Sequence, residues 1–289
     1  VTDHLISGDQ FSFVALEAGG GKGGSLMCPT ANKKLIVKEL SGDDDASLRR
    51  ISPQYIDRVL EPGPPSLLTL IFYHFERSGG QVFIVMGSLL PINSQVDELW
   101  DLKGCADDKA MRREGKVVPQ VHKRWFRCHW LIAEATCMDH MVPFSRQGYY
   151  KGKKDARTKS FYLPRECCDA ITDAIKKDVG MLTREEVMDY SLLVAVITRA
   201  KKDVKPAPLS GIGREAYVWE TDTHKTYVYV GIIDFLQGWT TGKKVAHVIK
   251  ACFAPKPIST IKPYPYGVQF LEDALGRFKP RESPGFGKG

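Results

Sequence analysis

The sequence predicts an α+β fold with two lobes, an N-terminal antiparallel sheet with one helix followed by a lobe of mixed helices and strands. In the first hundred residues, runs rich in β-branched and aromatic side chains alternate with turns, as expected for strands: FSFVAL, KKLIVKEL, SLLTLIFYHFE and QVFIVMGSLL. Beyond them, helical and strand patterns follow one another. With 289 residues, of which 43% are hydrophobic, the chain is long enough for one large domain or two lobes.

One helix is expected in the first lobe, over residues 41–60. Its first turn carries Asp43, Asp44 and Asp45, which suit the positive end of the helix dipole. We expect an interruption near Pro53, because proline removes a backbone donor from a helix interior.

The second lobe is expected to contain two helices and a mobile loop. Residues 122–140 read as a basic, aromatic-rich helix, and the basic, turn-rich residues 148–160 as the loop. Residues 163–180 predict a helix with Pro164 in its first turn and Gly180 as its stop.

Two strands and a disordered end complete the expected second lobe. The apolar runs 191–197 and 226–234 predict strands, with an exposed insert over 199–213 between them. The segment after Phe278 is rich in Pro, Gly and Lys, so we expect it to be disordered.

Composition narrows the class of protein. The formal net charge of +7 favours a polyanionic partner, either nucleic acid or an anionic membrane, although a charge that serves solubility explains it equally well. Seven irregularly spaced cysteines without a CxxC pair argue against a disulfide framework or a structural zinc site and favour a reducing compartment. No apolar run approaches the roughly 20 residues that a membrane helix requires.

A glycine-rich segment near the N-terminus indicates phosphate binding, although such a segment also matches patterns by chance. Gly19, Gly21 and Gly24 fit G-x-G-x-x-G, and a strand ending at Lys38 follows instead of the helix of a dinucleotide fold. In a glycine-rich hairpin, backbone amides cover phosphates and a lysine on the next strand reaches them. A P-loop is excluded because Lys22 is followed by Gly. The predicted nucleotide-binding residues are Gly21, Gly23, Gly24, Ser25, Lys38 and Asp44.

A strand lysine that binds phosphates needs a carboxylate to position it. Asp44, in the first turn of the helix over 41–60, is the candidate partner of Lys38. The alternative is that Asp44 only compensates the helix dipole.

Two aspartates mark the ends of the two predicted strands of the second lobe. Asp189 precedes the first strand and Asp234 ends the second. Phosphoryl transfer needs one carboxylate near the attacking hydroxyl and one to hold Mg²⁺ against the nucleotide phosphates. The alternative for Asp189 is a solvated carboxylate at a helix-to-strand corner. The protein-kinase strings H-R-D-x-x-x-x-N and D-F-G are absent from the sequence, and Lys103, taken alone, reads as a surface lysine.

Three strings in this order, DLKG, MDYSLL and GIID, resemble the signatures of the phosphatidylinositol phosphate kinases. The glycine loop with IVK is similar to the family's nucleotide-binding lobe, and LLP precedes DLKG as it does in the family. The segment KPISTIKPYPYGVQF is similar to the family's segment after its activation loop. The resemblance covers nearly the whole chain, over residues 10–278, and MDYSLL is its most specific part.

The resemblance implies a two-lobed kinase-like fold that forms a single catalytic domain over residues 1–278. Its nucleotide-binding lobe covers residues 1–98, its catalytic and lipid-binding lobe covers 99–278, and residues 279–289 are a disordered tail. The resemblance also implies ATP and Mg²⁺ as cofactors, a phosphatidylinositol monophosphate as substrate and an anionic phosphoinositide membrane as partner. A cytoplasmic location at the membrane surface and a homodimer are further expectations.

The resemblance also implies roles for single residues. Lys38 contacts the ATP phosphates, Asp189 is the catalytic residue beside the inositol hydroxyl, and Asp234 holds Mg²⁺. Lys103 of DLKG helps to bind the nucleotide or the transferred phosphate.

The chain departs from the family pattern at three places. Cys105 stands where Ser usually follows DLKG, and Gln269 stands where Arg often precedes the Phe of the closing segment. The basic run that usually follows DLKG is replaced by ADDKAMRR, in which Lys109 or Arg112 is the candidate substitute.

The segment after Asp234 corresponds to the family's activation loop, which reads the lipid headgroup. As a helix, it presents Val245, Val248, Ile249 and Phe253 as one apolar stripe. A basic amphipathic helix suits an anionic surface, where each basic residue contributes about 1 kcal/mol. The alternative is an ordinary helix packed on the protein. The residues expected at the lipid or membrane are Lys243, Lys244, Ala246, Lys250 and Trp239.

Ala246 bears on the choice of substrate. In the family, Glu two residues after the paired lysines accompanies action on the 4-phosphate, and Ala accompanies action on the 5-phosphate. Ala246 therefore favours a 5-phosphate 4-kinase, but 4-phosphate 5-kinases are the more widespread type, so both stay open.

The sequence also bears on functions other than a lipid kinase. A soluble inositol-phosphate kinase or a protein kinase is disfavoured by the basic amphipathic segment. A pseudokinase that serves as a membrane-bound scaffold is disfavoured by the complete set Lys38, Lys103, Asp189 and Asp234. A nucleic-acid binder is the weakest alternative, because the basic residues lie in scattered loops.

Overall fold

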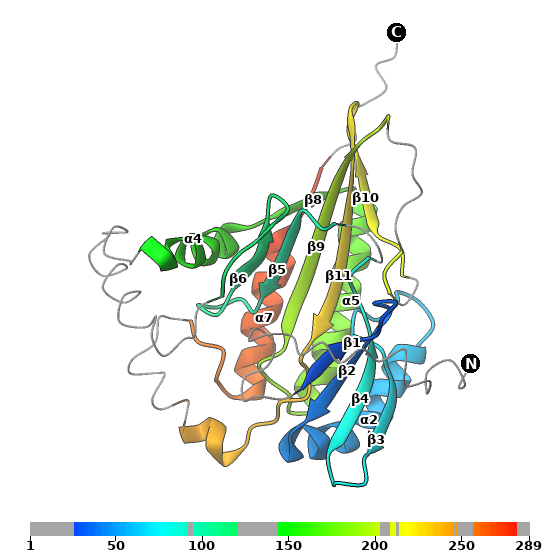
Figure 1. The fold of residues 1–289 in the computed structure, drawn as a ribbon, viewed down its shortest axis with the longest axis vertical. Coiled ribbons are helices and arrows are strands. Elements are labelled where there is room, and N and C mark those ends of the chain that lie inside the picture. Colours follow the sequence, from blue (N-terminus) through cyan, green and yellow to red (C-terminus); the bar gives the residue numbers. More distant parts are fainter. Residues whose placement is uncertain are drawn as a thin grey trace.

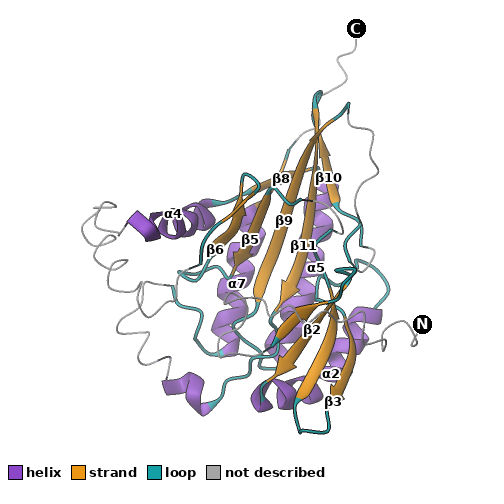
Figure 2. Cartoon of the chain, in the orientation of Figure 1, coloured by secondary structure: helices purple, strands orange, loops and turns teal. Residues whose placement is uncertain are grey.

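The computed structural model describes residues 26–91, 95–120, 144–202, 209–211, 214–245, 247 and 257–281. These residues form a mixed α and β structure with two main antiparallel sheets and helices packed against them (Figure 2). The smaller sheet lies at one end of the larger sheet (Figure 1). The predicted combination of an N-terminal antiparallel sheet with a following α/β region is confirmed at this level.

The smaller sheet has four antiparallel strands in the order β1-β2-β4-β3. The strands are β1 Met27–Pro29, β2 Leu35–Leu40, β3 Ile71–Glu76 and β4 Val82–Gly87. Lys38 lies in the central strand β2, opposite Met27 of β1 and Ile84 of β4. Three of the four strands predicted for the first hundred residues are confirmed, and FSFVAL lies outside the described residues.

Helix α2, Gly42–Leu60, follows β2. The Ser41 hydroxyl accepts a hydrogen bond from the Asp44 amide at 3.2 Å, which caps the helix. The predicted interruption at Pro53 is wrong, because the helix continues through this residue. Proline removes one backbone hydrogen bond, but the buried side chains of Ile51 and Tyr55 on either side of it hold the helix in place.

The larger sheet has six antiparallel strands in the order β10-β11-β9-β5-β6-β7. The strands are β5 Glu98–Leu102, β6 Lys109–Arg113, β7 Lys116–Val117, β9 Ser191–Ala200, β10 Tyr217–Glu220 and β11 His224–Ile233. The predicted strands over 191–197 and 226–234 are confirmed as neighbours, β9 and β11, which pair from Ser191↔Ile233 to Ala200↔His224. Strand β5, which leads into Lys103, pairs with the other side of β9.

Two sequence predictions about the helices are wrong. Residues 148–160 were expected to be a mobile loop, but most of them belong to helix α4, Phe144–Thr158. Tyr149, Lys153 and Ala156 form its buried face, so that a lysine occupies a core position. Gly180 does not end helix α5, Arg165–Arg184. The buried Met181 and Leu182 beyond it stabilise another turn and offset the cost of about 1 kcal/mol for a helical glycine.

Helix α7, Pro263–Arg277, leads directly into the short strand β12, Phe278–Pro280. Strand β12 pairs in parallel with β8, Phe161–Leu163. Lys279 and Pro280, which were predicted to be disordered, are part of this strand. Residues 282–289 and the helix predicted over 122–140 lie outside the described residues.

Helices α5 and α7 cover one face of the larger sheet (Figure 1) and enclose the main hydrophobic core with it. Tyr190 lies at the centre of this core, with its ring edge-on to Tyr266 at 4.9 Å and to Phe270 at 4.8 Å between ring centroids. The Tyr266 hydroxyl donates to the Tyr190 carbonyl. The chain on either side of Tyr190 is thereby fixed to α7. In the described part of the chain, no helix is both long and apolar enough to cross a membrane.

Candidate active site

The two predicted acids lie at the same end of neighbouring strands. Asp189 stands two residues before the start of β9, and Asp234 directly follows the end of β11. The flanking segments are also joined, because Val187 and Gly238 form a β-bridge and the Met188 amide donates to the Gln237 carbonyl at 2.8 Å. The sheet therefore brings Asp189 and Asp234 to one place, as the sequence predicted from strands alone.

Both acids have a backbone conformation that most residues avoid. The φ angle is +64° at Asp189 and +58° at Asp234, in the left-handed region. A residue held in such a conformation costs about 1–3 kcal/mol, and these residues cluster at functional sites. The packing of Tyr190 in the main hydrophobic core and the pairing of β9 with β11 supply the contacts that hold the backbone at both acids.

Lys103 is the direct partner of Asp189. Its ammonium lies 2.6 Å from Asp189 Oδ1 and also donates to the Asp189 carbonyl, and both side chains are buried. Burial alone lowers the pKa of Lys103, but the charges of Asp189 and Asp101 outweigh it, so that the pKa is raised. Lys103 is therefore a charged, buried lysine and not the surface residue that its sequence alone indicated.

The chain turns sharply at Gly104, directly after Lys103. Its φ of +66° suits glycine, and a Cβ atom there would lie 2.7 Å from Cβ of Asp273 on α7. We expect Gly104→Ala to destabilise the protein by about 2 kcal/mol or more, because it adds backbone strain to a steric clash. Denaturant unfolding monitored by circular dichroism measures the change.

The matched control for Gly104→Ala is Gly276→Ala in helix α7, where an added Cβ meets no atom within 4 Å. Alanine there should stabilise the helix by about 0.5–1 kcal/mol. Equal stabilities of the two variants would contradict the proposed close contact at Gly104.

A second lysine approaches Asp189 from the segment after β11. Lys243 lies 3.6 Å from Asp189 Oδ2 and donates to the Gln237 side chain. Of the other residues expected at the lipid, Lys244 is exposed. Trp239 is half-buried against the main core, with its ring 5.8 Å from that of His247. Ala246 and Lys250 lie outside the described residues.

Lys38 of the smaller sheet reaches the second acid. Its ammonium lies 2.8 Å from Asp234 Oδ1, and the Asp234 side chain is 48% exposed. Asp234, rather than the predicted Asp44, is thus the carboxylate that Lys38 binds. Asp44 lies close by, and its pKa is raised. Burial is the main cause and the charge of Asp234 adds to it, whereas the charges of Lys38 and Lys243 oppose the rise. The glycine loop with Gly21, Gly23, Gly24 and Ser25 lies outside the described residues.

The structure shows the contacts of Lys109, Arg112 and Cys105, three residues at which the sequence departs from the family pattern. Lys109 pairs with Asp101 at 2.9 Å, next to Lys103. Arg112 donates to the Gly115 carbonyl at 2.6 Å and thus stabilises the turn between β6 and β7, whereas Lys109 lies near Lys103. The thiol of Cys105 is buried, and burial raises its pKa far above the usual range, which makes it an unreactive group.

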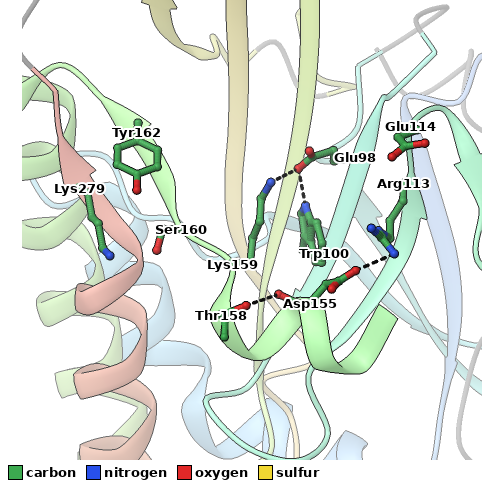
Figure 3. A pocket seen from close by; sticks show the side chains of 10 residues that line it. All are labelled: Glu98, Trp100, Arg113, Glu114, Asp155, Thr158, Lys159, Ser160, Tyr162 and Lys279. Carbon is green, nitrogen blue, oxygen red and sulfur yellow. Dashed lines mark hydrogen bonds and ion pairs between the residues drawn. The ribbon is translucent and has the colours of Figure 1, made fainter. Parts of the chain in front are cut away.

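A pocket of about 450 Å³ lies elsewhere, between β5, β6, the end of α4, β8 and β12 (Figure 3). Four of its charged side chains form ion pairs: Lys159 with Glu98 at 2.5 Å and Arg113 with Asp155 at 2.6 Å. The residues that line it include none of Lys38, Lys103, Asp189 and Asp234. We therefore place the candidate active site at the two acids and not in this pocket.

The site combines a buried carboxylate held by a lysine with an exposed carboxylate beside a lysine from another sheet. Carboxylates and lysines of this kind recur at sites of phosphoryl transfer. The family model described as "Phosphatidylinositol-4-phosphate 5-Kinase" matches residues 14–211 and 211–274, and the chain belongs to this family. The resemblance found in DLKG, MDYSLL and GIID is thus confirmed.

Similar proteins carry related names. The chain is 25% identical to a probable phosphatidylinositol phosphate kinase of Dictyostelium discoideum, over 87% of this chain and 40% of that protein. It is 25% identical to a putative 1-phosphatidylinositol 3-phosphate 5-kinase of Drosophila melanogaster, over 92% of this chain and 12% of that protein. It is 21% identical to phosphatidylinositol 5-phosphate 4-kinase type-2 gamma of Danio rerio, over 88% of this chain and 68% of that protein. The chain therefore spans less than half the length of the first two.

Proposed function

We propose that the chain is a lipid kinase domain that transfers the γ-phosphoryl group of ATP to an inositol hydroxyl of a phosphatidylinositol monophosphate. The observation that carries this proposal is the buried pair of Lys103 and Asp189, at the strand end next to Asp234. Family membership supports the same reaction.

In this proposal Asp189 is the catalytic base. Its carboxylate accepts the proton of the attacking inositol hydroxyl, whose oxygen forms the new bond to the γ-phosphorus while the bond to the ADP oxygen breaks. Lys103, charged and buried at 2.6 Å from Asp189, orients this carboxylate and offers positive charge to the transferred phosphoryl group. Lys243, on the other oxygen of Asp189, is placed to bind the phosphate that the lipid headgroup already carries.

The residues present fit a nucleotide with Mg²⁺. Asp234 presents a half-exposed carboxylate next to Lys38, and Mg²⁺ is usually held by one or two carboxylates together with substrate phosphates. Within the described ranges, no group of three His, Cys, Asp or Glu side chains could hold a metal ion alone. When bound, Mg²⁺ neutralises the developing phosphate charge. Lys38 then contacts the phosphates, and the charge of Asp44 acts on Lys38 from the first turn of α2.

We further propose that the two sheets belong to the two lobes of a single catalytic domain over residues 1–278, with the boundary near residue 98. The smaller sheet and α2 form the nucleotide-binding lobe, and β5 begins the catalytic lobe. The ion pair between Lys38 and Asp234 crosses between these lobes and supports a nucleotide site between them. The exposed Lys244 and the basic segment around it face an anionic phosphoinositide membrane in this proposal.

A lipid kinase assay tests the proposal. The protein is incubated with radiolabelled ATP, Mg²⁺ and phosphatidylcholine–phosphatidylserine vesicles that carry the 3-, 4- or 5-monophosphate, and the product isomers are separated. We expect a labelled bisphosphate from at least one of these lipids and none from vesicles without phosphoinositide. The preferred isomer decides between the 4-phosphate and the 5-phosphate, which Ala246 leaves open.

Parallel reactions in the same assay distinguish the alternatives. Label in soluble inositol phosphates or in a generic protein substrate, but in no lipid, would favour a soluble kinase. No transfer to any acceptor would favour a scaffold and overturn the proposal.

A further inference from the structure

Asp108 is a buried carboxylate behind Lys103 that the proposed reaction does not use. Its side chain is 2% exposed, and its Oδ1 accepts hydrogen bonds from the amides of Lys103 at 2.6 Å and Cys105 at 3.3 Å. The Asp108 amide in turn donates to the Cys105 carbonyl at 3.0 Å. Asp108 thereby fixes the backbone of the turn from which the Lys103 side chain extends to Asp189.

Arg277, at the end of α7, holds Asp108 in place. Its Nη2 lies 2.6 Å from Asp108 Oδ2, and its Nε lies 2.5 Å from Oδ2 of Asp273 on the same helix. Another nitrogen, Nη1, donates to the Ala156 carbonyl of α4 at 2.6 Å. A single buried guanidinium therefore connects α7 and α4 to the turn after Lys103.

The charged and titratable groups around Asp108 come from three elements. Helix α7 contributes Arg277, Asp273 and the hydroxyl of Tyr266, and the turn contributes Lys103, Cys105 and Asp107. Helix α4 contributes Lys153, whose ammonium donates to the Asp108 carbonyl at 3.0 Å. Burial raises the pKa of Asp108 to about 6, and Arg277 opposes this rise. At neutral pH the carboxylate is therefore charged and paired with Arg277.

We propose that Asp108 is a positioning residue for phosphoryl transfer, which holds the Lys103 backbone so that the Lys103 ammonium meets Asp189. The reason is mechanical: the only part of Lys103 that Asp108 binds is its amide, whereas the ammonium binds Asp189. A shift of the amide moves the ammonium with it, and misplacement by about 1 Å can cost about 100-fold in rate. This role rests on the proposed function of the site.

The test compares Asp108→Asn with Asp273→Asn. Both replacements are nearly isosteric and both remove a carboxylate from Arg277, but only Asp108 also contacts the Lys103 amide. Asp108 uses one oxygen for the Lys103 amide and the other for Arg277, whereas asparagine has a single acceptor oxygen and turns a donor towards one of these two partners. We expect Asp108→Asn to lower kcat by about tenfold or more and to leave the KM for ATP within about twofold, because ground-state binding is not affected. Asp273→Asn should retain kcat within about twofold. Equal kcat values for the two variants would contradict the proposal.

The pH dependence adds a readout that a purely structural role would not change. Protonated Asp108 resembles Asn, so the ratio of wild-type to Asp108→Asn activity should fall towards one as the pH drops through about 6. The titration of the lipid phosphate cancels in this ratio. A ratio that stays constant between neutral and acidic pH would contradict the proposal.

Two further measurements keep the proposal testable if the first variant does not fold or the protein phosphorylates no lipid. Asp108→Glu keeps the charge but displaces the carboxylate, so a positioning role predicts a similar loss of kcat, and wild-type activity would contradict it. Crystal structures of Asp108→Asn or Asp108→Glu and of Asp273→Asn need no activity. We expect the Lys103 ammonium to move away from Asp189 only in the Asp108 variant, and an unchanged contact there overturns the positioning role independently of the proposed function.

Discussion

Asp189→Asn is expected to lower kcat by about two to four orders of magnitude, the usual contribution of a general base. Asparagine keeps the shape of the side chain and tolerates the left-handed backbone at this position, so the fold should survive. Its amide cannot accept the hydroxyl proton, however, and it leaves the buried Lys103 ammonium with the carbonyl of residue 189 but without the carboxylate. The loss should therefore appear in kcat, whereas the KM for ATP changes little.

Steady-state lipid phosphorylation measures this effect, and calorimetric titration with ATP and Mg²⁺ reports whether the nucleotide still binds. Asp222→Asn is the matched control, because Asp222 is an exposed aspartate in the turn between β10 and β11, at the opposite end of β11 from Asp234. This variant should have wild-type kcat. If Asp189→Asn keeps more than about a tenth of the wild-type kcat, Asp189 is not the base.

The sequence predicted those parts of the site that depend on strand periodicity. The apolar runs that became β9 and β11 are long and continuous, which is typical of buried strands. Their ends therefore placed Asp189 and Asp234 without any knowledge of tertiary structure. Pairing from Ser191↔Ile233 onwards then makes the two acids neighbours.

Contacts over long sequence separations could not be predicted in the same way. Lys103 and Asp189 are 86 residues apart, and Lys38 and Asp234 are 196 apart. Neither pair leaves a local pattern, so Lys103 reads as a surface residue and Asp44 reads as the partner of Lys38. Helix α4 was missed for a related reason, because its buried Lys153 finds its acceptor, the Asp108 carbonyl, only in the folded protein.

Asp178→Ala is expected to destabilise the protein by about 3–5 kcal/mol, because it removes one partner of a buried ion pair. Asp178 of α5 is fully buried, and its Oδ1 lies 2.8 Å from Nε of Arg58 on α2. The same carboxylate accepts hydrogen bonds from the Ser66 hydroxyl at 2.9 Å and the Leu67 amide at 2.7 Å. Burial raises the pKa of Asp178 and Arg58 lowers it. Alanine would leave the buried Arg58 guanidinium with only the partly exposed Glu61 at 3.4 Å, and two buried donors without their acceptor.

Denaturant unfolding measures this change, with Asp173→Ala as the matched control on the exposed face of the same helix. The control should lie within about 0.5 kcal/mol of wild type apart from its helix propensity. A loss below about 1 kcal/mol for Asp178→Ala would contradict the role assigned to this pair.

Asp178 joins the main hydrophobic core to α2 and to the segment that enters β3. Helix α2 also carries Asp44 and Tyr55, and the ring of Tyr55 stacks on Phe235 with 5.6 Å between the ring centroids. Because Phe235 directly follows Asp234, loss of this link should loosen the attachment of the smaller sheet at the place where Lys38 and Asp234 meet.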